Sequence, residues 1–176
     1  MIVGGRAMRG RWRAAEANLA FGALIHEADR LHALGQPVDT PHVLAPSAAL
    51  VVLVRNITDS PTFAPYRVQP DLPWPLVFAA GPRDASVVLL VDRMLLNVRG
   101  YHRYGTFQPS GEDFQVVLHC TLVAWAERRV LLDYSVRGDA PSNRAGLPTV
   151  FGLTNRVGPD PWPEAGRRLS SYMKRF

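Results

Sequence analysis

Residues 114–125, FQVVLHCTLVAW, decide the fold class of this chain. Every second residue from Phe114 to Ala124 is apolar, and this alternation predicts a β-strand, because alternate side chains of a strand point to the same face of a sheet. The opposite face is mixed in character and comprises Gln115, Val117, His119, Thr121, Val123 and Trp125. The stretch therefore predicts a strand with one fully apolar face and one partly polar face.

Two further apolar runs flank this strand. Residues 130–136 follow it after the short polar link 126–129, and this spacing predicts an antiparallel hairpin. Residues 87–98 precede it and predict the first strand of the same meander. Residues 99–113 then form a long hairpin loop between the first and second strands.

The chain before the meander contains a shorter apolar run. Residues 48–54 are too few for a typical helix and are rich in valine, so they predict a buried strand that ends in a polar turn. Five prolines between residues 61 and 75 exclude a regular helix there. Residues 76–79 are expected to add a short edge strand, where proline nearby is tolerated.

Amphipathic helices are predicted near both ends of the chain. Within residues 13–34, apolar side chains recur at helical spacing, and Gly35 followed by Pro37 supplies a stop. Near the C-terminus, Asp160 and Pro161 are typical of the start of a helix, and apolar residues recur from Trp162 to the end of the chain.

These elements predict an α+β fold in which an antiparallel sheet of hairpins is packed by an N-terminal and a C-terminal amphipathic helix. Helices on one face of a sheet are the simplest layered arrangement, so both helices are expected on the same face. A β-sandwich with appended helices is the alternative, since the second face of residues 114–125 is also partly apolar. The length of 176 residues predicts a single domain, residues 1–176, with a basic N-terminal arm at residues 1–12.

Composition restricts the classes of function. The 20 basic and 15 acidic residues give a net charge of +5, which is compatible with nucleic acid or an anionic surface, but the charges are scattered. Cys120 is the only cysteine, so an intramolecular disulfide and a cysteine-based zinc site are excluded. No apolar run is long enough for a transmembrane helix. The sequence as given predicts a cytoplasmic location, and a cell-envelope location if a leader has been removed.

Candidate catalytic residues do not combine into a known arrangement. His119 and Cys120 are adjacent on a predicted strand and should point to opposite faces, which excludes a nucleophile–base pair and leaves Cys120 as a core residue. Asp92, Arg93 and Asp133 interrupt apolar strands, and a cross-strand ion pair is the favoured interpretation.

The polar residues of the first helix and the search for sequence motifs give the same result. His26, Asp29 and His32 are expected to be solvated positions on that helix rather than metal ligands. Phosphate-loop and nucleophile-elbow motifs are absent. The sequence thus predicts no catalytic residues, no metal site, no cofactor and no enzymatic activity.

The hairpin loop at residues 99–107 is the candidate binding site. Aromatic rings and guanidinium groups are enriched where proteins bind other proteins, and they also stack on unpaired bases. Loops held by a rigid sheet are frequent binding sites. The candidate binding residues are Arg99, Tyr101, His102, Arg103, Tyr104 and Phe107.

The run LVVLVRNITD at residues 50–59, an apolar strand that ends in Asn56-Ile57-Thr58, resembles the opening strand of accessory domains in bacterial envelope machines. The curli-secretion lipoprotein and the amino-terminal domain of the TolB type are the two families concerned. The later strand, long loop and hairpin are similar as well, although a proline-rich segment stands where those domains place a helix. The resemblance implies a non-catalytic component of a larger assembly.

Two functions are expected from these observations. The first is a structural or adaptor subunit of a multiprotein assembly, with other protein subunits as partners, and the resemblance implies the bacterial cell envelope as its setting. The alternative is an RNA-binding or single-stranded-nucleic-acid-binding protein that uses the arginine and aromatic side chains of the 99–107 loop.

Overall fold

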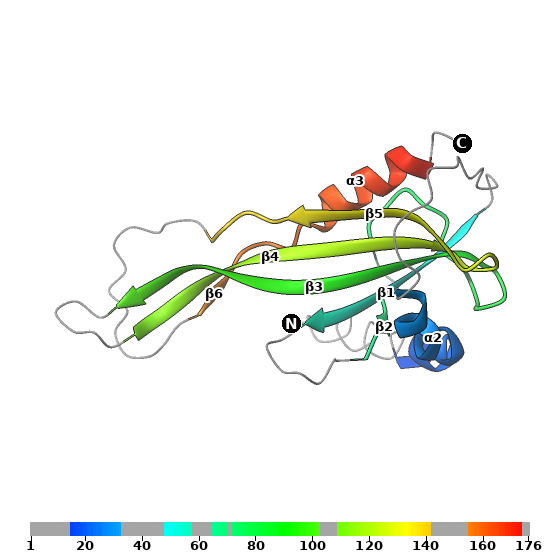
Figure 1. The fold of residues 1–176 in the computed structure, drawn as a ribbon, viewed down its shortest axis with the longest axis horizontal. Helices are drawn as coiled ribbons and strands as arrows, with labels where there is room; N and C mark the ends of the chain where they lie inside the picture. Colours follow the sequence, from blue (N-terminus) through cyan, green and yellow to red (C-terminus); the bar gives the residue numbers. More distant parts are fainter. Residues whose placement is uncertain are drawn as a thin grey trace, which may run out of the picture.

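The protein folds around one mixed, mostly antiparallel sheet (Figure 1). The computed structural model describes residues 15–32, 48–57, 65–69, 72–102, 109–141 and 155–173. Its strands are β1 (Ala49–Ile57), β2 (Arg67–Val68), β3 (Ala85–His102), β4 (Pro109–Ala124), β5 (Arg129–Arg137) and β6 (Arg156–Val157). Their order is β2-β1-β3-β4-β5, and β6 pairs with β4. The α+β fold class predicted from the sequence is confirmed.

The β3–β4 hairpin is the centre of the sheet. The antiparallel register runs from Val87 opposite Ala124 to His102 opposite Pro109. On one side β5 pairs antiparallel with β4, as the short polar link predicted. On the other side β1 pairs parallel with β3, so the sheet is mixed rather than purely antiparallel. A parallel pair cannot be joined by a tight turn, and here residues 58–84 connect the two strands.

Several strands are longer than predicted. β1 continues through Arg55 and Asn56 to Ile57, where a polar turn was expected. β3 continues to His102 and β4 begins at Pro109, so most of the expected 99–113 loop is strand. The expected edge strand at residues 76–79 is reduced to a single bridge between Phe78 and Leu50. The strands end where backbone hydrogen bonding between them ends, and polar side chains do not interrupt this hydrogen bonding.

The two helices lie on opposite faces of the sheet, so the expectation that they share one face is wrong. Residues 15–20 are helical and continue through Phe21 into α2 (Gly22–His32), which covers one face. The C-terminal helix α3 (Trp162–Met173) covers the other (Figure 1). The reason lies in residues 87–91 of β3, which are apolar at every position and at most 1% exposed, so both faces need a cover.

The two faces have separate cores. Leu89, Leu118 and Leu122 pack with Leu169 of α3 on one face. Leu53 and Leu90 belong to the core that Phe21, Leu24 and Ala28 complete on the other face. The described strands form a single sheet covered by helices, which corresponds to the predicted fold and not to the β-sandwich alternative.

Trp74 packs the segment that follows β2 against α3. Its indole Nε1 donates a hydrogen bond of 3.0 Å to the carbonyl oxygen of Trp162, and the ring lies against Gly166. A Cβ atom at Gly166 would come within 2.3 Å of the indole nitrogen. The glycine is therefore required by the close approach of Trp74 to the helix.

Candidate functional site

A projecting part of the β3–β4 hairpin is the most unusual feature of the sheet. We call it the arm and define it as residues 95–102 of β3 and residues 109–115 of β4. β1 ends at Ile57 opposite Met94, and β5 ends at Arg137 opposite Val117, so the arm continues where its neighbours stop. Strands of 18 and 16 residues exceed the roughly 3–10 residues that are usual. Figure 1 shows the hairpin extending well beyond both helices.

The arm exposes large apolar side chains. Leu95, Leu96 and Val98 of β3 are 42–43% exposed, and Val157 of the adjoining β6 is 47% exposed. Leu95 and Leu96 are consecutive residues of a strand, so they point to opposite faces. Apolar side chains that gather on a protein surface mark sites of interaction with other molecules.

The base of the arm is held by an ion pair in which the carboxylate is buried and the guanidinium is partly exposed. Asp113 of β4 is 2% exposed, and both of its carboxylate oxygens accept hydrogen bonds of 2.7 Å from Arg156 of β6. Bidentate pairing of this kind fixes orientation as well as charge. Nearby, Asn97 Oδ1 accepts a hydrogen bond from the backbone N–H of Arg99 at the bulge in β3. The arm is thus a fixed extension of the sheet at its base.

The chain also closes tightly beside the arm, directly after the ends of β5 and β6. A Cβ atom at Gly138 would lie 2.3 Å from the carbonyl oxygen of Pro159, and one at Gly158 would lie 2.1 Å from that of Asp139. Backbone N–H groups of these two glycines donate to the carbonyl oxygens of Val116 and Phe114. Both glycines are needed for β6 to continue the edge that β5 leaves.

Only part of the predicted binding loop lies in the described residues. Arg99 is an exposed residue of β3, and the backbones of Tyr101 and His102 pair with Gly111 and Pro109. The side chains of Tyr101 and His102, and the whole of Arg103, Tyr104 and Phe107, lie outside the described part of the chain. The basic N-terminal segment, residues 1–12, also lies outside the described part of the chain.

Sequence reasoning missed the apolar residues of the arm. Leu95, Leu96 and Val98 were assigned to an ordinary strand, and Val157 was assigned to no element. The available signal is the apolar run 94–96, which resumes directly after Asp92 and Arg93.

A buried charge network separates the arm from the body of the sheet. Arg55 of β1 lies opposite Asp92 of β3, and two guanidinium nitrogens donate to the Asp92 carboxylate at 2.6 and 3.1 Å. The Tyr66 hydroxyl donates to the same carboxylate at 2.9 Å, and the guanidinium lies 4.6 Å from the centroid of the Tyr66 ring. All three residues are at most 8% exposed. Buried charges of this kind are tolerated only when they are paired and hydrogen-bonded.

The same row of the sheet continues with polar residues on β4 and β5. His119 lies opposite Ser135, with Nδ1 at 3.0 Å from the Ser135 Oγ, and Nε2 is 3.4 Å from a carboxylate oxygen of Asp133. Serine hydrolases combine these residue types, but their catalysis also requires oxyanion donors and a concave site. None of the pockets described below is lined by these three residues. We interpret the trio as cross-strand hydrogen bonding.

A cross-strand ion pair forms as predicted, but it joins Asp92 to Arg55 of β1. Arg93 forms an ion pair of 2.8 Å with Asp160, which lies between β6 and α3, and Asp133 contacts the His119 imidazole. Arg93 and Asp133 cannot meet, because β4 lies between their strands.

Cys120 has the environment of a core residue. The side chain is fully buried, and burial raises the pKa of the thiol from 9.0 to about 12. Reactive cysteines have the opposite property, a lowered pKa in an accessible position. The Tyr134 hydroxyl donates a hydrogen bond of 3.0 Å to the carbonyl oxygen of Ala165, and burial likewise raises the pKa of this hydroxyl.

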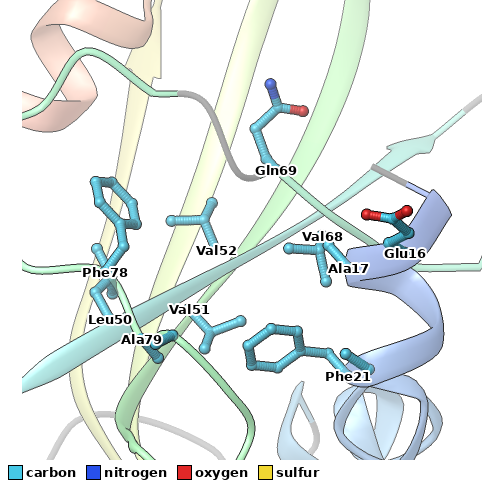
Figure 2. Close-up of a pocket in the computed structure, with 12 residues that line it drawn as sticks. Glu16, Ala17, Phe21, Leu50, Val51, Val52, Val68, Gln69, Phe78 and Ala79 are labelled. Atoms are coloured by element: carbon cyan, nitrogen blue, oxygen red, sulfur yellow. The ribbon is translucent and has the colours of Figure 1, made fainter. Parts of the chain in front are cut away.

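A pocket of about 340 Å³ opens at the outer edge of β1 (Figure 2). Two short segments pair with this edge of β1. In the first, the Gln69 N–H donates a hydrogen bond to the carbonyl oxygen of Val52, and in the second, the Ala79 N–H donates one to that of Leu50. The pocket lies between them, and the helical residues Ala17 and Phe21 close it from the side. Figure 2 shows the Phe21 ring turned toward Val51, with Phe78 and Leu50 on the opposite wall. Two further hollows, of about 420 and 470 Å³, flank α3.

Within the described ranges, no group of three or more histidine, cysteine, aspartate or glutamate residues is placed to hold a metal ion. The helices in these ranges also lack the length and apolar character that crossing a membrane requires. No protein-family model, curated protein or solved structure matches the chain.

Proposed function

We propose that this protein is a non-enzymatic structural or adaptor subunit of a multiprotein assembly, and that the arm contacts a neighbouring protein. The single observation that carries the proposal is the projecting hairpin with large apolar side chains exposed on both of its faces. The bacterial cell envelope, which the family resemblance implies, is the proposed setting of this assembly.

The energetics of the arm support a protein partner. Apolar surface gains roughly 25 cal/mol for each Å² removed from water, and Leu95, Leu96 and Val98 remain partly uncovered in the chain itself. A partner that packs on both faces of the arm would recover this free energy. Because the ion pair between Asp113 and Arg156 already orders the base, less conformational entropy is lost on binding.

The exposed apolar side chains of the arm favour a protein partner over nucleic acid, and two nearby arginines are already engaged by carboxylates. Binding to phosphates requires basic side chains that are directed outward. Arg156 is engaged by Asp113, and Arg93 is engaged by Asp160. The apolar side chains Leu95 and Leu96 are better suited to a protein surface than to a phosphate backbone.

The proposal is tested by sizing an epitope-tagged chain in extracts of its native cells. The tested variant is Leu95→Ser with Leu96→Ser, and the control is Val77→Ser, an exposed apolar residue of the body. We expect the wild type and the control to elute in a large complex and the double variant to elute as a free monomer. Elution of the wild type only as a monomer would contradict the proposal. Loss of the complex on nuclease treatment would instead favour the nucleic-acid alternative.

A further inference from the structure

The pocket at the edge of β1 has the dimensions and lining of a small-molecule site. Ligand sites are mostly apolar cavities of roughly 300–1,000 Å³ with a few polar groups that fix orientation. This pocket, of about 340 Å³, is walled by buried residues of the sheet and helix: Phe21, Leu50, Val51, Val52 and Val68. A ligand of the size of one aromatic ring with a short chain fits inside it.

The walls of the pocket are supported from several directions. The Asn18 side chain accepts a 2.8 Å hydrogen bond from the backbone N–H of Val68, which ties the helix to β2. Leu50 exchanges backbone hydrogen bonds with Val77 and Ala79 at the opposite end. Such a pocket is largely formed before a ligand arrives, which reduces the free-energy cost of binding.

The charge at the rim determines the class of ligand. Glu16, an exposed residue of the helix, and Gln69, which follows β2, are polar residues that line the pocket, and both are labelled in Figure 2. In the part of the chain that the structure describes, Glu16 has no ion-pair partner, whereas Glu27 and Glu164 are both engaged by arginines. A carboxylate at the mouth of an apolar pocket favours a ligand with a cationic end and an apolar body.

We propose that this pocket binds a small amine with an aromatic or branched aliphatic body, whose ammonium group lies at Glu16 and whose body lies between Phe21, Val51 and Phe78. The site is separate from the arm, so it stands or fails independently of the proposed assembly function.

The test uses the full chain and three near-isosteric probes, followed by ¹H–¹⁵N chemical shifts. The probes are 2-phenylethylamine, the neutral 2-phenylethanol and the anionic 3-phenylpropionate. We expect saturable shifts at the backbone amides of Ala17, Val51, Gln69 and Ala79. Since two charges about 4 Å apart near water contribute roughly a factor of five, the amine should bind about fivefold more tightly than the alcohol, and the carboxylate more weakly than either.

Three variants separate the roles of charge and shape. Glu16→Gln should lower amine affinity about fivefold, to that of the alcohol, and leave alcohol affinity unchanged. Ala17→Leu retains a good helix former, narrows the pocket and should weaken binding of both probes by a similar factor. The matched control Glu127→Gln removes an acidic side chain in the β4–β5 turn that does not line the pocket, and should bind all probes as the wild type does.

Two results would overturn the proposal. Absence of saturable shifts up to the solubility limit of the amine would show that the pocket takes no such ligand. Equal affinity for the amine and the carboxylate, unchanged by Glu16→Gln, would remove Glu16 from the recognition of the ligand. Neither result would affect the sizing experiment on the arm.

Discussion

The body and the arm are built from the same two strands, yet apolar side chains are buried in the body and exposed in the arm. Leu89 and Leu95 lie on the same face of β3, but Leu89 is 0% exposed and Leu95 is 43% exposed. In the body, β1, β5 and a helix on each face cover β3 and β4. In the arm these neighbours have ended. Burial is therefore decided by which elements reach a residue, and the apolar residues of the arm contribute little to folding.

The boundary between the two regions is marked by charge. The Arg55–Asp92 pair lies on the α2 face, and the Arg93–Asp160 pair lies on the α3 face at the next residue of β3. Both pairs fall where the two-sided core ends. If the body stabilises the fold and the arm serves binding, substitutions in the two regions should have separable effects.

The largest difference is expected between the two ion pairs at the boundary. Asp92→Ala leaves the guanidinium of Arg55 buried without its carboxylate and should lower the free energy of unfolding by about 3–5 kcal/mol. Arg93→Ala breaks a more exposed pair and should lower it by less than about 1 kcal/mol. Urea denaturation measures both values, and equal losses would show that the Arg55–Asp92 pair is not buried as described.

A pair of leucine truncations compares body and arm directly. Leu89→Ala leaves a cavity in the core under α3 and should cost about 2–5 kcal/mol of unfolding free energy. Leu95→Ala, on the same strand and face, should change stability by no more than about 0.5 kcal/mol. The same denaturation assay applies. A large loss from Leu95→Ala would mean that the arm is packed against another part of the chain.

Two glycine substitutions sharpen the comparison. Gly166→Ala places a methyl group against the indole of Trp74 and should destabilise the fold by about 1–3 kcal/mol. Gly100→Ala in the arm meets no atom within 4 Å and should be neutral or stabilising by up to about 1 kcal/mol. Thermal unfolding followed by tryptophan fluorescence checks both, and a stable Gly166→Ala protein with unchanged fluorescence would contradict the described contact.

Chemical labelling of cysteine thiols compares the body with the arm and changes the structure least. The raised pKa of Cys120, about 12, keeps the thiol protonated in the folded chain near pH 8, and burial blocks access to it. A thiol-specific chromogenic disulfide should react with the native chain only as fast as the chain unfolds. A cysteine introduced by Leu96→Cys should react at once. Fast labelling of the wild type would contradict the core position of Cys120.

The raised pKa of Cys120 also predicts the sign of a pH effect. The unfolded thiol ionises near its ordinary value of 9.0, whereas the folded thiol ionises only near 12. The contribution of this group to stability is therefore complete below pH 9 and is lost as the pH rises toward 12. Unfolding free energies measured in that interval should fall as the pH is raised.

Local sequence pattern was sufficient for the elements of the body. The alternation around Leu118 and Leu122 identified β4, the short link 126–129 identified the β4–β5 hairpin, and helical spacing identified α3. These features depend on neighbours in the sequence. Which helix covers which face of the sheet depends on contacts between residues far apart in the chain. The continuous apolar run of β3 is compatible with a helix on either face.

The candidate sites were harder to predict for a related reason. Arg55 and Asp92 are 37 residues apart, and their pairing requires the parallel register of β1 and β3. Gly100, Gly111 and Pro109 are typical of loops, yet they lie in strands because the hairpin continues through them. The pocket needs four segments, the helix, β1, residues 68–69 and residues 78–80, and no local motif indicates their meeting.

The most direct test of the central claim is site-specific photocrosslinking in native cells. The photoreactive residue p-benzoylphenylalanine replaces Leu96 in the arm or, in a parallel strain, Val77 in the body, both of which are exposed apolar positions. If the arm contacts a neighbouring subunit, illumination produces a discrete adduct with another protein from position 96 and none from position 77. An adduct from position 77 alone, or an adduct with nucleic acid from position 96, would contradict the account.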